Sequence, residues 1–130
     1  MNPLTDEWIA KAEADYRMAA REIAAPDCPS WDGVCFHAQQ SAEKYIKAVL
    51  QERDVAFPRI HDLRKLVDLL SPPPQELVAM MGDLGALSEL AVSARYPGYF
   101  ADEQSAHQAL AIAGRVRATC RQALNLSRNN

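Results

Sequence analysis

The sequence predicts an all-α protein, an up-and-down bundle of four long helices plus one short helix. Three observations lead to this fold class. Apolar residues recur every three or four positions along most of the chain, alanine is abundant within those windows, and only five glycines occur. No segment shows the alternation that is typical of a strand. At 130 residues the chain has the commonest size of one domain, so we expect a single helical domain over residues 1–130.

The first helix is expected from Thr5 to Ala25. Thr5 is its candidate N-cap, acidic residues follow in the first turn, and Pro26 ends the pattern. The inward positions are spaced three or four residues apart: Trp8, Ala12, Tyr16, Ala19 and Ile23.

A second helix is expected to begin between Ser30 and Asp32 and to run to Arg53. At about 100° per residue its apolar positions gather on one side; they are Val34, Cys35, Ala38, Ala42, Tyr45, Ile46 and Val49. The opposite side carries a row of polar residues, which we call the α-helical stripe: His37, Gln40, Lys44 and Lys47.

Three further helices complete the predicted bundle. A short one spans His61–Leu70, with Asp62 in its first turn, and a longer one spans Glu76–Ala94, weakened by Gly82 and Gly85. A Pro-Gly turn follows, and the last helix runs from an N-cap at Asp102 to Leu126.

Composition and charge exclude several classes of protein. With 14 Lys and Arg against 17 Asp and Glu the net charge is -3, which argues against a broad basic surface for duplex nucleic acid. No apolar run is long enough for a membrane span or a signal peptide, so we expect a cytoplasmic protein. Three cysteines without a paired spacing make a zinc site improbable, and we expect neither metal nor cofactor.

The α-helical stripe is the first candidate site. One imidazole, one amide and two ammonium groups on one helix face are suited to holding phosphates, and His37 would supply a proton donor near neutral pH. The alternative is a solvated face on which Glu43 pairs with Lys47 four residues later.

Two other positions are candidates. His61 is suited to act as an acid or base with Asp62 orienting it; the alternative is that Asp62 caps a helix while the histidine packs between helices. Arg95, flanked by Tyr96 and Tyr99, offers a phosphate clamp beside aromatic surfaces that stack on a base. Its alternative role is an interaction with the end of a helix, with the tyrosines packing the turn.

The remaining reactive side chains are assigned structural roles. They are His107, the three cysteines Cys28, Cys35 and Cys120, and the two tryptophans Trp8 and Trp31. No serine has a histidine and a carboxylate at an interpretable spacing, and the chain lacks a glycine-rich phosphate loop.

Three strings, in this order and spacing, resemble the HEPN family (higher eukaryotes and prokaryotes nucleotide-binding domain). They are the segment Val34–Leu50 with its polar and apolar positions, His61-Asp62-Leu63 followed by Leu66, and Arg95-Tyr96-Pro97-Gly98. The resemblance covers the chain from about Trp8 to Leu124.

The resemblance implies a four- to five-helix bundle, usually homodimeric, with a cleft for nucleotide or RNA. Such proteins often accompany a minimal nucleotidyltransferase as toxin and antitoxin respectively. Many members are metal-independent ribonucleases that use an arginine, an adjacent polar residue and a histidine four to six residues further on. Here Arg95 matches the arginine, but Tyr96 follows it, and His107 is twelve residues beyond Arg95. The ribonuclease motif is therefore incomplete, which leaves catalysis an open question.

Our leading hypothesis is a HEPN-type nucleotide- or RNA-binding protein, a homodimer partnered with a nucleotidyltransferase. The first alternative is a metal-independent ribonuclease with a displaced catalytic histidine, for which the catalytic candidates are His37, His61 and Arg95. The second alternative is a non-catalytic structural interaction module. The expected ligand-binding residues are His37, Gln40, Lys44, Lys47, Asp62, Arg95, Tyr96 and Tyr99.

Overall fold

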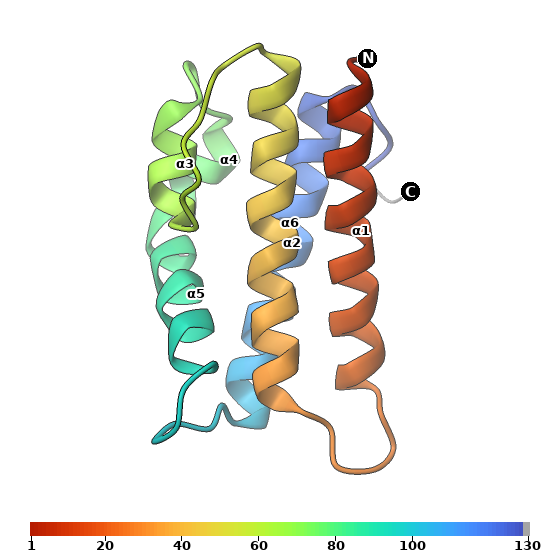
Figure 1. The fold of residues 1–130 in the computed structure, drawn as a ribbon, viewed down its shortest axis with the longest axis vertical. Helices are drawn as coiled ribbons and strands as arrows, with labels where there is room; N and C mark the ends of the chain where they lie inside the picture. The colour runs from red at the N-terminus through yellow and green to blue at the C-terminus, as the bar shows by residue number, and fades with distance from the viewer. Residues whose placement is uncertain (129–130) are drawn as a thin grey trace.

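The computed structural model describes residues 1–128, and all regular elements in that range are helices. In chain order they are α1 (Pro3–Ile23), α2 (Trp31–Glu52), α3 (Leu63–Leu69), α4 (Gln75–Ala79), α5 (Met81–Ser93) and α6 (Glu103–Ala123). The long helices run alternately down and up, and α3 lies beside the upper part of α2 (Figure 1). The predicted all-α bundle is confirmed.

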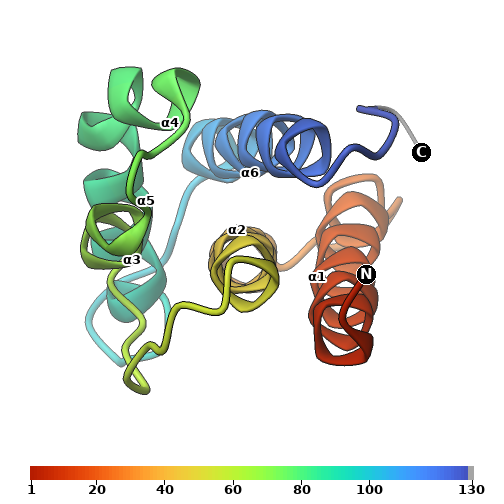
Figure 2. The same cartoon turned by 90° about the horizontal axis from the view of Figure 1, so that it is seen from above.

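Helix α2 occupies the centre of the bundle. Seen from above, α1 lies on one side of it, α3 and α5 lie on the other, and α6 covers a third side (Figure 2). The apolar side predicted for this helix is buried throughout, and Tyr45 and Ile46 are fully inaccessible. Each such large side chain contributes about 1.5–3 kcal/mol by leaving water. One side of α2, facing the viewer in Figure 1, has no helix over it.

The first predicted cap is wrong. Helix α1 begins at Pro3 because the side chain of Asn2 accepts a hydrogen bond from the backbone N–H of Leu4, and proline is favoured in the first turn. Thr5 is buried inside the helix, where its hydroxyl donates to Glu52 of α2 at 3.0 Å. The helix ends at Ile23, two residues before the predicted end.

The predicted helix over residues 76–94 consists of two helices, α4 and α5. They are separated at Met80, whose backbone leaves the helical region with φ -112° and ψ 22°. Gly82 and Gly85, which were expected to weaken the helix, lie within α5 and do not interrupt it. Met80 is 2% exposed, so its burial in the core accompanies the change of direction.

Asp102 caps α6 as expected, and α2 begins at Trp31, within the predicted range, with Ser30 as its cap. The short helix predicted over His61–Leu70 is shorter, because Asp62 accepts from the backbone N–H groups of Arg64 and Lys65 and so caps α3 from the position just before its first residue instead of lying in its first turn. Helix α6 ends at Ala123 rather than at Leu126, because Asn125 adopts a left-handed conformation with φ 60°. None of the helices within residues 1–128 combines the length and the apolar character that crossing a membrane requires.

Candidate functional site

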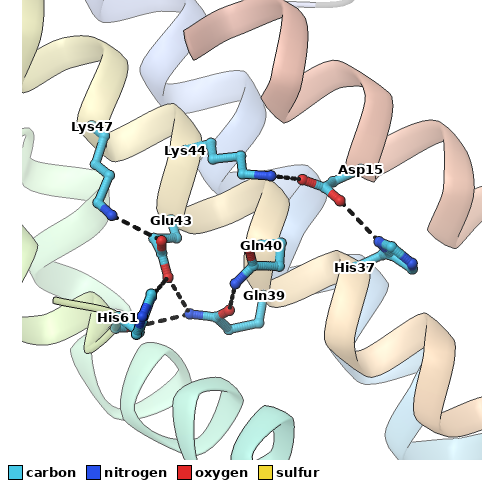
Figure 3. Close-up of polar contacts among 8 residues, drawn as sticks. All are labelled: Asp15, His37, Gln39, Gln40, Glu43, Lys44, Lys47 and His61. Carbon is cyan, nitrogen blue, oxygen red and sulfur yellow. Dashed lines mark hydrogen bonds and ion pairs between the residues drawn. The ribbon is translucent and has the colours of Figure 1, made fainter. Parts of the chain in front are cut away.

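The α-helical stripe is divided between two buried carboxylates. The first is Asp15 of α1, which accepts a hydrogen bond from Nδ1 of His37 at 2.8 Å and one from Nζ of Lys44 at 2.6 Å (Figure 3). Asp15 is buried, whereas His37 and Lys44 are partly exposed. Because one oxygen serves each partner, the carboxylate offsets positive charge at this end of the stripe and fixes the orientation of the imidazole.

The second carboxylate is Glu43 of α2 itself, whose side chain is 4% exposed. It accepts from Nζ of Lys47 at 2.9 Å, and it lies 3.0 Å from Nδ1 of His61 (Figure 3). The Lys47 ammonium also lies 5.5 Å from the ring of Trp8, and its side chain is only 7% exposed. The sequence pattern placed Lys47 on an exposed face, but its side chain is buried. Aromatic rings and a buried acid surround its charge in place of water.

The amide of Gln40 links to the same network. It donates to the side-chain oxygen of Gln39 at 2.9 Å, and the amide of Gln39 donates to the backbone carbonyl of His61 at 2.9 Å (Figure 3). Gln39 is buried, so this contact fastens the segment that precedes α3 to α2.

His61 and Asp62 do not act as a pair. The carboxylate of Asp62 accepts from the backbone N–H of Arg64 at 3.0 Å and caps α3. His61 is oriented instead by Glu43, and its side chain is 67% exposed. The backbone N–H of Leu63 donates to the hydroxyl of Ser88 at 3.1 Å, which joins the start of α3 to α5.

Arg95 lies in the turn after α5 and stacks on an aromatic ring of α2. Its guanidinium carbon lies 4.8 Å from the ring centroid of Phe36. The imidazole of His37 also lies edge-on to Phe36, with 5.2 Å between the ring centroids. No carboxylate within residues 1–128 forms an ion pair with Arg95. An arginine without an acidic partner, stacked on a ring, is well suited to receiving a phosphate.

The turn that carries Arg95 exposes a group of aromatic rings. Tyr96 is 61% exposed, Phe100 is 88% exposed and Tyr99 is 36% exposed. The turn is held by Gly98, whose φ of 95° is readily adopted by glycine. Exposed rings on a short turn are suited to stacking against bases or to packing against another protein.

A cavity of about 260 Å³ lies beside Arg95. Its lining combines residues from three segments that are far apart in the sequence: Gln39, His61, Asp62, Ser88, Glu89, Ala91, Val92 and Arg95. The cavity therefore brings together His61, Asp62 and Arg95, which were singled out from the sequence, and it does not include His37, Lys44 or Lys47. His37 is connected to this cavity indirectly: its imidazole contacts the ring of Phe36, and that ring contacts Arg95, which lines the cavity.

A larger cavity, of about 590 Å³, lies on another side of the bundle and includes Tyr16, Glu76 and His107. Its cationic side chains already have acidic partners: Arg128 lies 3.2 Å from Glu76, and Arg115 lies 3.3 Å from Asp83. His107 is exposed, with Glu103 at 3.9 Å. Because these acidic partners offset the positive charge, the larger cavity is less suited to an anionic ligand than the cavity beside Arg95.

The cysteines and tryptophans lie outside the cavity beside Arg95. Burial raises the pKa of Cys35 to about 11 and that of Cys120 to about 12, while Cys28 is exposed. Trp8 and Trp31 are partly buried and pack against the core. Within residues 1–128 no three His, Cys, Asp or Glu side chains are grouped so that they would hold a metal ion.

Three important residues were missed by the sequence reasoning. Asp15 was detectable, because it lies three residues after Ala12 and four before Ala19 on the inward side of the first helix. Glu43 was considered only as a surface partner of Lys47. Phe36 gave no signal of its own, because the residue that stacks on it is distant in the sequence.

Comparisons with known proteins agree with this architecture. A family model described as the HEPN domain matches residues 5–123. The crystal structure of an archaeal HEPN homologue is similar to this chain, with 24% sequence identity and a TM-score of 0.67, over 93% of this chain and 95% of that one. At that identity the likeness concerns the fold. A comparison with curated proteins gives no match. Since the family model covers most of its length, the chain belongs to the HEPN domain family.

Proposed function

We propose that this protein binds RNA or a nucleotide at the surface centred on Arg95. The observation that carries the proposal is that Arg95, which has no acidic partner within residues 1–128, stacks on Phe36 and lines the same cavity as His61. The guanidinium would hold a phosphate by paired hydrogen bonds, which is the geometry that arginine favours.

The surroundings of Arg95 suit the other parts of a nucleotide. Tyr96 and Phe100 are exposed rings in the same turn as Arg95, and a base would stack on them. A cavity of about 260 Å³ is large enough for one small group, not for a whole dinucleotide. Of the expected contacts we retain Arg95, Tyr96, Tyr99 and His37. We leave out Lys44 and Lys47, because each ammonium group is paired with a buried acid, and Gln40 and Asp62, because their side chains are hydrogen-bonded to Gln39 and to the start of α3.

The test is RNA binding measured by fluorescence anisotropy with a labelled single-stranded RNA of mixed sequence. We expect Arg95→Ala to weaken binding by about tenfold or more, since a charge-assisted hydrogen bond contributes about 1.5–3 kcal/mol. The dependence of log K on log salt should also become shallower by about 0.7 for each lost phosphate contact. Arg21→Ala is the control, because Arg21 is exposed on α1 and forms no ion pair within residues 1–128.

Equal affinity of the wild-type protein and Arg95→Ala would refute this site. If the wild-type protein binds neither RNA nor any nucleotide but still self-associates, the structural interaction module is the better explanation.

RNA cleavage is a second candidate function, favoured by one contact. Because Asp15 lies 2.8 Å from Nδ1 of His37, Nε2 is left without a partner within residues 1–128. His37 and Arg95 both contact the Phe36 ring, at 5.2 Å and 4.8 Å from its centroid. In this arrangement Nε2 would take the proton of a 2′-hydroxyl as its oxygen attacks the phosphorus, and Arg95 would stabilise the charge that develops on the phosphate. The bond from phosphorus to the 5′-oxygen then breaks and a 2′,3′-cyclic phosphate forms, while the leaving oxygen takes a proton from water and His37 returns its own proton to the solvent.

Cleavage should then occur in the presence of a chelator and should be lost in His37→Ala. His107→Ala is the matched control, since His107 is exposed elsewhere on the bundle. Cleavage that persists unchanged in purified His37→Ala would exclude this role for His37.

The homodimer and the nucleotidyltransferase partner stay predictions from family membership. Both would be accommodated by the exposed rings of the turn, since exposed apolar patches commonly mark protein interfaces. Sedimentation velocity of the wild-type protein and of Phe100→Ser measures whether a second copy covers this turn: a dimer that dissociates in the variant supports that arrangement, and an unchanged sedimentation coefficient contradicts it.

A further inference from the structure

The segment that leads into α3 carries three exposed cations close together. Arg59, Arg64 and Lys65 are all exposed, and none has an acidic partner within residues 1–128. Asp68 on the same helix is exposed and lies beyond ion-pair distance from both Arg64 and Lys65. In a protein whose acidic residues outnumber its basic ones, three unpaired cations within seven positions form a local positive surface.

The backbone that carries two of these cations is fixed, and the side chain of Arg64 packs against α5. The carboxylate of Asp62 accepts from the backbone N–H groups of Arg64 and Lys65, at 3.0 Å and 3.4 Å, which fixes the start of α3. The side chain of Arg64 then lies across Gly85 of α5: a Cβ atom at Gly85 would come within 3.0 Å of its Cδ. The absence of a side chain at Gly85 therefore leaves room for Arg64 against α5.

The same face of α5 leads from Arg64 to Arg95. Gly85 lies against the side chain of Arg64. Ser88 and Glu89, one turn later, line the cavity, and so does Arg95 just after the end of α5. Ten residues separate Gly85 from Arg95, which corresponds to about 15 Å along a helix. Adjacent phosphates of a stacked strand rise by about 3.4 Å, so this distance corresponds to roughly four nucleotides.

We propose that Arg64 and Lys65 form a second phosphate-binding subsite, so that the ligand is a single-stranded oligonucleotide of about four or more nucleotides that runs along α5. The proposal rests on the function proposed for Arg95. A mononucleotide occupies only the Arg95 end, whereas a longer strand passes the cavity and reaches both cations. Glu89 and Asp62 lie between the two ends, so the phosphates are held mainly at the two ends and the middle of the strand contacts the cavity through its bases.

The experiment measures affinity against RNA length, with labelled single-stranded RNAs of one, two, four, six and eight nucleotides. For the wild-type protein, affinity should rise to about four to six nucleotides and then level. The double variant Arg64→Gln, Lys65→Gln should bind the dinucleotide as the wild-type protein does and the hexanucleotide at least tenfold more weakly. Its salt dependence for the hexanucleotide should be shallower by about 0.7 for each lost phosphate contact.

The control is Lys11→Gln, Arg17→Gln, which removes two exposed cations from α1 and leaves the net charge the same as in the test variant. If both double variants weaken hexanucleotide binding equally, the effect is one of overall charge and the subsite is refuted. The subsite is also refuted if affinity does not rise beyond one nucleotide, while loss of mononucleotide binding in Arg95→Ala would leave the proposed function intact. If no RNA or nucleotide binds, both proposals fail.

Discussion

Replacing Glu13 with glutamine tests the polar centre of the bundle, where α1, α2 and α6 meet. The carboxylate of Glu13 accepts from Nε of Arg117 at 2.9 Å and from Nη1 of Arg121 at 3.1 Å. The hydroxyl of Tyr45 also donates to it, and it does so in the middle of the core. Glutamine keeps the size of the side chain and one oxygen acceptor, so the variant removes the charge with little change in packing.

The expected loss follows from the burial of these groups. Breaking a fully buried ion pair costs about 3–5 kcal/mol. The side chains of Glu13 and Arg121 are 18% and 10% exposed, so water partly compensates, and we expect Glu13→Gln to lower the free energy of unfolding by about 2–3 kcal/mol. With an m-value of about 1–3 kcal/mol/M, the urea midpoint at pH 7 should fall by about 0.7–3 M.

The difference between the two proteins should depend on pH. Burial by itself raises the pKa of Glu13, but hydrogen bonds from Arg117 and Tyr45 and the charges of both arginines lower it overall. A carboxylate with a lowered pKa stabilises the fold above its unfolded pKa of about 4.3, and this contribution is lost as the pH falls through the lower pKa of the folded chain. The wild-type advantage should therefore be complete near pH 7 and should shrink below about pH 4.

The control is Asp83→Asn, which makes the same chemical change in an exposed pair with Arg115 and should cost less than about 0.5 kcal/mol. If Glu13→Gln also changes the free energy of unfolding by less than about 0.5 kcal/mol, the cost of removing these charges from water cancels their attraction, and our reasoning is refuted.

Two further predictions concern buried groups. In the native protein only Cys28 should react with a thiol reagent at pH 8, because burial raises the pKa of Cys35 to about 11 and that of Cys120 to about 12. The number of reacting thiols is measured by the absorbance released from an aromatic disulfide. Three reacting thiols before denaturation would contradict the prediction. The hydroxyl of Ser41 is buried without a hydrogen-bond partner within residues 1–128. Ser41→Ala should therefore raise the free energy of unfolding by about 1 kcal/mol, as measured by urea denaturation. A loss of stability in this variant would show that the hydroxyl does form a hydrogen bond.

Much of the fold could be predicted from the sequence because its signals are local. The apolar side of α2 and the caps Ser30 and Asp102 depend on residues within a turn or two of each other. The start of α1 was missed although Asn2 followed by Pro3 is itself a strong local signal; Thr5, also a favourable cap residue, competed with it. The division at Met80 has no glycine or proline to announce it, and it depends on the packing of α4 and α5.

The candidate site was less predictable because its contacts join distant segments. Whether His37 and Lys44 face solvent or an acid depends on Asp15, more than twenty residues earlier. Likewise, Arg95 meets Phe36 across about sixty residues of chain. Helical periodicity places a side chain on a face, but it contains no information on which other helix covers that face.

The location of the acids, more than that of the bases, determines where an anion would bind. The α-helical stripe concentrates positive charge in the sequence, yet Asp15 and Glu43 each accept from one of its lysines and each lie beside a histidine. Arg95 and the cations of α3 have no such partners within residues 1–128, so they do not have to give up an ion pair before they contact a phosphate. An ion pair that must be broken costs free energy whenever a ligand competes for it, so the binding that we propose along α5 would meet less competition than binding along α2, which carries the more conspicuous row of polar residues.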